Sequence, residues 1–425
     1  MCKWTASTVP AHRKVYIVCG FQHSIMADPY AMIPPNPFNA GSPIDPNDFV
    51  GRVQELETFR QRLRQTEEGS LASMAVAGGY GIGKTSFLHK CRSITEENNA
   101  LSIYFSLNEM DDLNRETLSK MLIERLQERV REEIILQRIS ATVLDTLKKI
   151  KIKISSFDEG PSVELGLDDN TSNTPFPNLH TALSVAWKAL QDHKKAIVFF
   201  IDEARVLEKN RADLILYLRA VLEQLQIDKV PVMIVPGGKL TISGPSGSGF
   251  SPLVRTFPPA VLENFTLEES KSFIRRKLTK VKLAISDEVL NLVYSVTEGH
   301  PFVLSAYMAT AYSKLKPGEG ELRKEHFEAT DIEFVKRVLS PFFSRFYDQV
   351  GKNSKSILTE MAKRGGKIEL SELCEVMGKE SNELSPYLAK LTQDGAILRI
   401  DRGKYKLFHK LLAQYVKQTA GLVFV

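Results

Sequence analysis

The chain has 425 residues, about three times the size of a usual domain, so two or three domains are expected. Hydrophobic residues make up 43% and charged residues 25%, which excludes a disordered, collagen-like or coiled-coil chain. The net charge is +5, from 56 basic and 51 acidic side chains, and this excess is too small to indicate nucleic acid or a membrane surface by itself.

The cysteines and the apolar runs indicate a reduced compartment. The four cysteines lie far apart without a CxxC pair, which argues against a disulfide framework and against a zinc knuckle. No stretch approaches the roughly 18 apolar residues that cross a bilayer. The early apolar run at 15–21 lacks a small-residue cleavage site. We therefore expect a cytoplasmic protein without a membrane partner.

The first half of the chain predicts an α/β fold. Six prolines between positions 29 and 46 predict an extended surface arm over residues 1–48. After it, apolar runs alternate with amphipathic segments, which predicts a parallel sheet sandwiched by helices over residues 49–260. The strands are expected at 71–77, 100–107, 196–201 and 232–235, and the helices at 53–63, 84–97, 115–139, 179–192 and 210–226.

One insertion interrupts this alternation. Residues 148–167 alternate with period two on both sides of a Gly-Pro turn, which predicts a protruding hairpin. The lysines on its first strand are either a solvated face or a finger that contacts phosphates.

The second half predicts two smaller domains. Strand signals stop after about residue 260, so residues 261–350 are expected to form a helical lid, with a small bundle at 267–316. Residues 351–425 predict a winged helix. Its helices are expected at 355–364, 370–377 and 381–394, and its strands at 396–400 and 405–408.

Residues 78–85 match the phosphate-loop pattern G-x-x-x-x-G-K-[ST], after a predicted strand and at the start of a predicted helix. Glycines let consecutive backbone N–H groups turn toward phosphates, and the helix N-terminus adds its positive dipole. Lys84 should reach the β- and γ-phosphates of ATP, and Thr85 should ligate Mg²⁺. The expected nucleotide-binding residues here are Gly78, Gly79, Tyr80, Gly81, Ile82, Gly83, Lys84, Thr85 and Ser86.

Two adjacent carboxylates follow the apolar strand at 196–201 and form a Walker B pattern. Asp202 would hold the Mg²⁺ shell, and Glu203 would orient and deprotonate the attacking water. The alternative is a helix N-cap followed by an acid in the first turn.

From residue 49 to the C-terminus the sequence resembles the AAA+/STAND class of P-loop ATPases, particularly archaeal and bacterial ATPases related to origin-recognition initiators. Phe49-Val50-Gly51-Arg52 resembles the entry motif near the adenine, which implies that Val50, Gly51 and Arg52 contact the nucleotide. The resemblance of Gly299-His300-Pro301 to the G-x-P motif of the lid implies that Pro301 packs near the base. His409 matches a histidine that senses phosphates in the winged helix, or it is an ordinary residue at a helix start.

The sequence departs from this family pattern at two places. The strand at 232–235 ends without the usual polar sensor 1 residue, and no sensor 2 arginine follows the lid motif. These departures favour a STAND-like switch over a ring motor. For an arginine finger, the resemblance implies Arg255, with Arg219 as second choice.

The C-terminal domain leaves two interpretations open. Residues 352–417 contain 13 basic and 8 acidic side chains, and Arg399, Arg402, Lys404 and Lys406 cluster in the predicted wing. The third helix, however, begins with two glutamates, which argues against sequence-specific readout of DNA bases. The domain either clamps the nucleotide domain and docks a protein, or makes weak, non-specific DNA contacts.

Together these features predict a regulatory ATPase that binds Mg·ATP, hydrolyses it slowly and delivers a conformational change to a protein partner, with nucleotide-dependent homo-oligomers as an expected form. The alternative is a DNA-associated ATPase similar to replication initiators or transposition helpers. A nucleotide-binding scaffold without turnover is disfavoured because both Walker motifs are intact.

Overall fold

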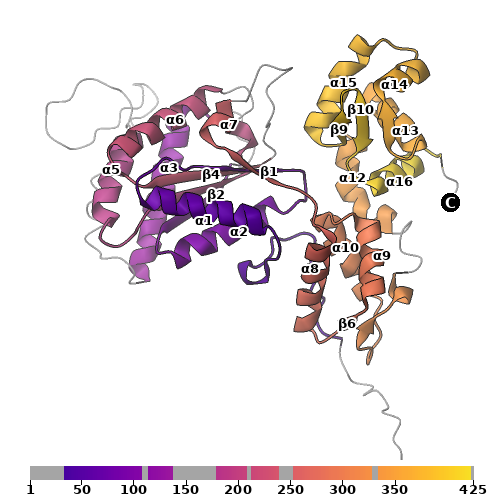
Figure 1. Ribbon diagram of the computed structural model, residues 1–425, viewed down its shortest axis with the longest axis horizontal. Coiled ribbons are helices and arrows are strands. Elements are labelled where there is room, and N and C mark those ends of the chain that lie inside the picture. Colours follow the sequence, from indigo (N-terminus) through magenta and orange to yellow (C-terminus); the bar gives the residue numbers. More distant parts are fainter. Residues whose placement is uncertain are drawn as a thin grey trace, which may run out of the picture.

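The computed structural model describes residues 33–107, 113–136, 179–207, 212–238, 252–327 and 334–422 (Figure 1). Within these ranges, parallel strands form a five-stranded sheet in the order β2-β3-β4-β1-β5. The strands are β1 (Ala75–Gly78), β2 (Leu101–Ser106), β3 (Ile197–Asp202), β4 (Val232–Gly238) and β5 (Pro259–Leu262). The fold is therefore the α/β P-loop architecture that the sequence predicts.

Helices cover both faces of this sheet because the side chains of each strand alternate between the two faces. Val76 and Phe200 pack with α1 and α2, whereas Ala77 and Phe199 pack with α3, α5 and α6. All four side chains are almost fully buried. The helices are α1 (Val53–Glu67), α2 (Lys84–Glu97), α3 (Arg115–Ile135), α5 (Leu179–Leu190), α6 (Ala212–Ile227) and the short α7 (Pro252–Thr256).

β5 was not predicted, and the two-residue strands at Ala284–Ile285 and Glu321–Leu322 contradict the expectation that strand signals stop after about residue 260. β5 pairs with β1 at one edge of the sheet, and it begins with Pro259, which an edge position tolerates. β4 also runs three residues beyond its predicted end at Val235. A Cβ at Gly237 would lie 2.7 Å from Leu88 Cδ1, and one at Gly238 would lie 3.2 Å from the backbone N of Ala204. The glycines thus let β4 continue under α2 and under the 3-10 turn η2 (Ala204–Leu207).

Helices dominate the rest of the chain, with short strands that the sequence pattern does not reveal. The lid segment contains α8 (Leu267–Lys280), β6 (Ala284–Ile285), α9 (Asp287–Thr297), α10 (Pro301–Tyr312) and β7 (Glu321–Leu322). The 3-10 turn Lys324–His326, a π-helical segment at Val335–Leu339 and α12 (Ser340–Tyr347) follow. The C-terminal segment contains α13 (Lys352–Lys363), β8 (Lys367–Glu369), α14 (Leu370–Met377), α15 (Ser381–Asp394), β9 (Ile397–Asp401), β10 (Lys404–Leu407) and α16 (Lys410–Thr419). The unexpected β8 completes an antiparallel sheet of order β8-β10-β9.

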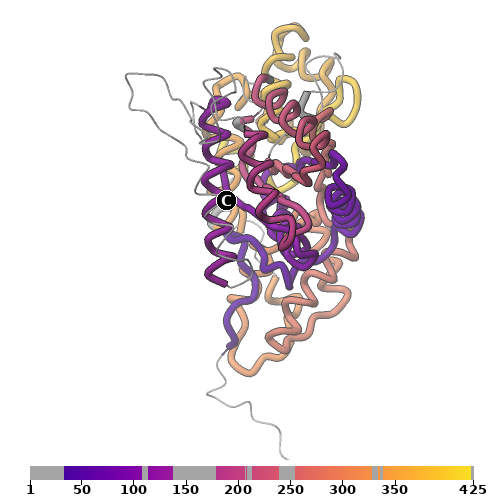
Figure 2. Tube along the Cα trace, turned by 90° about the vertical axis from the view of Figure 1, so that its left-hand side faces the viewer, coloured from indigo at the N-terminus to yellow at the C-terminus, as the bar shows by residue number. Residues whose placement is uncertain are grey.

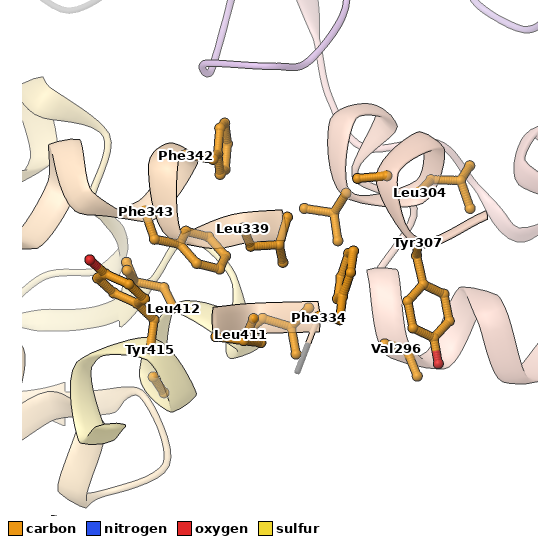
Figure 3. Packing of buried hydrophobic residues seen from close by; sticks show 14 of the residues in the cluster. Val296, Leu304, Tyr307, Phe334, Leu339, Phe342, Phe343, Leu411, Leu412 and Tyr415 are labelled. Carbon is orange, nitrogen blue, oxygen red and sulfur yellow. The ribbon is translucent and has the colours of Figure 1, made fainter. Parts of the chain in front are cut away.

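A single hydrophobic core joins the lid to the C-terminal segment. Phe334, Leu339 and Phe343 lie in one buried cluster with Tyr307 of the lid and Leu411 of α16 (Figure 3). Figures 1 and 2 show the result, a column beside the sheet with the C-terminal helices above the lid helices. Because the core is continuous, we expect the lid and the C-terminal segment to move together as one rigid body relative to the sheet.

The described part of the arm, residues 33–48, contacts the lid and α2 in addition to lying on the surface. Phe38 is only 4% exposed and packs edge-to-face on Phe273 of α8, with ring centroids 6.3 Å apart. The Tyr312 hydroxyl donates to the carbonyl of Pro34 (2.8 Å), and the N–H of Ile44 donates to Ser86 Oγ on α2 (3.1 Å). After these contacts, the 3-10 turn Pro46–Asp48 leads into the entry motif. The arm therefore links the lid to the helix that starts at the phosphate loop.

Two further points concern the predicted hairpin and membrane-spanning helices. The hairpin expected at 148–167 lies outside the described residues. Among the helices that are described, none is long and apolar enough to span a bilayer.

Candidate functional site

The loop between β1 and α2 forms a cradle for an anion. Gly81 and Gly83 have positive φ values of 73° and 95°, and Gly83 is the N-cap of α2. Among the described residues, no acceptor receives the backbone N–H groups of residues 79–83. Free N–H groups at a helix N-terminus are the usual elements of a phosphate site.

Lys84 is the cation of this cradle. Its Nζ donates to the carbonyls of Gly79 (2.7 Å) and Gly78 (3.3 Å), so the ammonium lies inside the loop. Burial lowers the pKa of Lys84, and the charges of Glu203 and Asp202 oppose this shift. A partly desolvated ammonium with carbonyl partners only is well placed to exchange them for phosphate oxygens.

The structure brings together the two residues predicted to hold a metal. The Thr85 hydroxyl donates to Asp202 Oδ2 (2.7 Å), and the Tyr104 hydroxyl donates to the same oxygen (2.9 Å). Hydroxyl and carboxylate oxygens suit Mg²⁺, which usually takes its remaining ligands from water and phosphate. Among the described residues, no group of three or more His, Cys, Asp or Glu side chains is placed so that it could hold a metal ion.

Tyr104 was not foreseen as part of this site. It lies on β2 beside β3, and burial followed by the charge of Asp202 raises its pKa, so the phenol remains a donor. From the sequence, a tyrosine in an apolar strand looks like an ordinary core residue.

Glu203 follows Asp202 in an unusual backbone conformation. Its φ is 51°, in the left-handed region, where a residue other than glycine pays roughly 1 kcal/mol. Its N–H donates to Asp202 Oδ1 (2.9 Å), and its side chain is exposed. Asp202 therefore accepts from the backbone of Glu203 with one oxygen and from the hydroxyls of Thr85 and Tyr104 with the other.

The entry motif joins the phosphate loop to the lid. The Arg52 guanidinium donates to the carbonyls of Ile82 (3.4 Å) and Glu263, and it lies 4.9 Å from the ring centroid of Phe265. The Arg52 N–H donates to Glu269 Oε1 (2.9 Å), and a Cβ at Gly51 would lie 2.5 Å from that oxygen. Arg52 is 5% exposed and burial lowers its pKa, while Val50 packs against the lid core. The motif thus ties the loop to the lid in this conformation.

The lid motif packs directly on the phosphate loop. Pro301 begins α10, and His300 is its N-cap. His300 Nε2–H donates to the carbonyl of Tyr80 (3.1 Å), and the N–H of Phe302 donates to the carbonyl of Gly81 (3.2 Å). His300 was part of the predicted motif without a role, and in the structure it makes a polar contact between lid and loop.

His409 contacts the lid rather than the phosphate loop. It is the N-cap of α16, where Nδ1 accepts from the N–H of Leu411 (3.1 Å) and Nε2–H donates to the carbonyl of Thr297 (2.9 Å). In this conformation His409 is thus a residue at a helix start, and its contact with a nucleotide stays a prediction. Both ring nitrogens of His409 already make hydrogen bonds, so in this conformation neither is available to bind a phosphate. The centroid of the His409 ring lies 5.9 Å from that of the His300 ring, and His300 in turn contacts the loop at Tyr80.

The two arginines considered as fingers differ in exposure. Arg255 is exposed on α7, whereas Arg219 is half-buried. Arg219 on α6 pairs with Glu223 four residues later (2.7 Å), a contact typical of a solvated helix face.

A third arginine, which belongs to none of the sequence motifs, lies at the loop. The guanidinium carbon of Arg345 on α12 is 3.6 Å from the ring centroid of Tyr80. The ring of Phe342, from the same helix, is 5.4 Å from that of Tyr80. The charge of Arg345 contributes to the lowered pKa of Lys84, after burial.

The buried contact of His300 predicts a pH dependence of stability. Burial, and then the nearby His409, lower the pKa of His300 to about 3, against about 6.5 for a free imidazole. The unfolded chain therefore takes up the proton first, and the free energy of unfolding falls as the pH drops from about 6.5 toward about 3. His300→Gln can still donate to the Tyr80 carbonyl but does not titrate. By calorimetry, we expect the Tm of the wild type to fall more steeply than that of the variant between about pH 7 and about pH 5; parallel curves would contradict the assignment.

Comparison with known proteins agrees with this geometry. Residues 48–235 match a family model described as an AAA ATPase domain, and residues 340–416 match a domain of unknown function. An uncharacterized HTH-type transcriptional regulator of Methanocaldococcus jannaschii is 23% identical over 88% of this chain and 91% of its own length.

Two solved structures share the fold over most of the chain. A Walker-type ATPase of Pyrococcus abyssi matches with a TM-score of 0.57 and 16% identity, over 90% of this chain and 99% of that one. The ORC2 protein of Aeropyrum pernix, solved as ADPNP and ADP complexes, matches with a TM-score of 0.52 and 11% identity, over 91% of this chain and 98% of that one.

Proposed function

Because residues 48–235 match a family model described as an AAA ATPase domain, we propose that the protein binds ATP with Mg²⁺, hydrolyses it slowly and acts as a nucleotide-controlled switch. One observation carries this proposal. The unpaired N–H groups of residues 79–83 and the Lys84 ammonium lie beside the Thr85–Asp202 pair, with Glu203 exposed one residue further on. These are the groups that phosphoryl transfer to water requires.

Each residue has a distinct role in this proposal. The loop N–H groups and Lys84 bind the β- and γ-phosphates, while Thr85 and Asp202 hold Mg²⁺, which neutralises charge on the phosphate oxygens when bound. Glu203 accepts a proton from the attacking water. Tyr104 fixes the orientation of the Asp202 carboxylate through its hydrogen bond. Arg255, exposed on α7, is the proposed finger toward a second copy in a nucleotide-dependent oligomer.

The output of the switch is proposed to be the position of the column formed by the lid and the C-terminal segment. We keep the boundaries 49–260, 261–350 and 351–425 for the nucleotide-binding, lid and winged-helix domains. The order α13, α14, α15 and the sheet β8-β10-β9 support the winged-helix assignment. His409 holds α16 on the lid, and the outer surface of the winged helix is proposed to dock a protein partner.

The second candidate function, weak and non-specific DNA binding, is favoured by the wing. Arg399, Arg402 and Lys406 are exposed on or between β9 and β10, and the relative in Methanocaldococcus is named an HTH-type regulator. Phosphate contacts from these side chains would release counterions, so binding would weaken steeply with salt.

A salt-titrated DNA-binding assay with and without ATP discriminates between the two functions. If the wing binds DNA, Arg402→Ala weakens binding on all sequences alike and lowers the salt slope by about one. The matched control is Arg323→Ala, an exposed arginine of the lid that pairs with Glu321. Absence of salt-dependent binding by the wild type would exclude the DNA function and leave the protein partner.

A further inference from the structure

The helix between the lid and the C-terminal segment supplies a cation to the phosphate loop. On α12, Phe343 and Phe342 both belong to the buried cluster (Figure 3), and Phe342 also stacks on Phe302 with ring centroids 4.4 Å apart. A Cβ at Gly81 would lie 3.3 Å from the ring of Phe342. The side of α12 that carries Phe342 is therefore packed against the loop.

Arg345 projects from this same side, one helical turn after Phe342. Its guanidinium lies over Tyr80, the third residue of the loop, and it is close enough to Lys84 to lower the pKa of that lysine. Among the described residues, no carboxylate lies within ion-pair distance of Arg345, although many other exposed arginines of the chain have one. Two cations thus lie at one loop, and the guanidinium of Arg345 contacts the rings of Tyr80 and, at 5.8 Å, Phe346.

We propose that Arg345 is a ligand of the terminal phosphate of ATP, provided from within the same chain. This inference rests on the proposed function and adds the group that distinguishes ATP from ADP. A guanidinium gains more from charge-assisted, bidentate contact with a phosphate than from stacking on an exposed ring. With ADP the γ-phosphate is absent, and Arg345 remains stacked on Tyr80.

The position of Arg345 couples the nucleotide to the C-terminal segment. α12 shares the buried core with α16, where the rings of Phe343 and Tyr415 are 5.8 Å apart. If the γ-phosphate displaces Arg345 and α12, packed side chains rather than a loop therefore transmit this displacement to α16. A ligand shifts a conformational equilibrium only through contacts that differ between the two states, and the contact of Arg345 with the γ-phosphate is such a difference.

The test is the affinity of full-length variants for ADP and for a non-hydrolysable ATP analogue, measured by calorimetry with Mg²⁺. We expect Arg345→Ala to bind ADP within about twofold of the wild type and the ATP analogue roughly 10- to 100-fold more weakly. Arg345→Lys keeps the charge without the bidentate fork, so its affinity for the analogue should fall between these values. The matched control, Arg323→Ala, should bind both nucleotides like the wild type.

The other outcomes overturn the inference. Equal loss of both nucleotides would mean that Arg345 only docks α12 on the loop, and unchanged affinity for both would mean that it never reaches the phosphate. Thermal melting identifies a variant that fails to fold, and Arg345→Lys then decides the question. A wild type that binds neither nucleotide would refute the proposed function itself, a result that the ADP measurement separates from failure of Arg345 alone.

Discussion

Replacing Glu203 by glutamine is expected to slow ATP hydrolysis by about 10²-fold or more while ATP stays bound. The amide keeps the size and the exposed position of the side chain but no longer accepts a proton from water. The strained φ of 51° supports this role, because strain of this kind persists mainly where a side chain must be held in place for function.

Phosphate release at saturating ATP measures the hydrolysis rate, and calorimetry confirms that the nucleotide is bound. The control is Glu68→Gln, an exposed carboxylate at the C-terminal end of α1, which should leave the rate unchanged. Turnover of Glu203→Gln at the wild-type rate would place the general base elsewhere.

The second large effect is expected for Lys84→Ala, which should weaken ATP binding by about 10²-fold or more. The variant removes the cation of the cradle, and its hydrogen bonds to the carbonyls of Gly78 and Gly79 are not part of the core. The fold should therefore persist, with a Tm within a few degrees of the wild type.

Lys90→Ala, on the same helix α2, is the matched control and should bind ATP normally. Unchanged affinity of Lys84→Ala for ATP would remove the phosphate-loop assignment. A lowered affinity that accompanies a large loss of Tm would instead indicate unfolding, and circular dichroism distinguishes the two cases.

Local patterns were sufficient to predict much of the fold. The bounds of the helices at 84–97, 370–377 and 381–394 agree with the structure, because glycine or a capping residue marks their ends. The short strands β5 and β8 were missed, since three or four residues show no clear period and β5 begins with proline. The buried position of Phe38 depends on α8, more than 200 residues away, which no local pattern encodes.

The candidate site divides in the same way. Within the phosphate loop and within the Walker B motif the residues are contiguous in sequence, so each motif by itself indicates the chemistry that it supports. Tyr104, His300 and Arg345 reach the site only through tertiary packing, and alone each looks like a core residue, a helix cap or a solvated charge. His409 is the converse case, because its family pattern suggested a phosphate contact and its hydrogen bonds are made with the lid and α16 instead.

Small-angle X-ray scattering of the full-length protein tests the central claim most directly, which is that the bound nucleotide sets the position of the lid and C-terminal column. The measurement compares samples saturated with ADP and with a non-hydrolysable ATP analogue, both with Mg²⁺. We predict two different scattering curves for the wild type, and a smaller difference between them for Arg345→Ala. Superimposable curves for the wild type, with saturation verified by calorimetry, would contradict the switch.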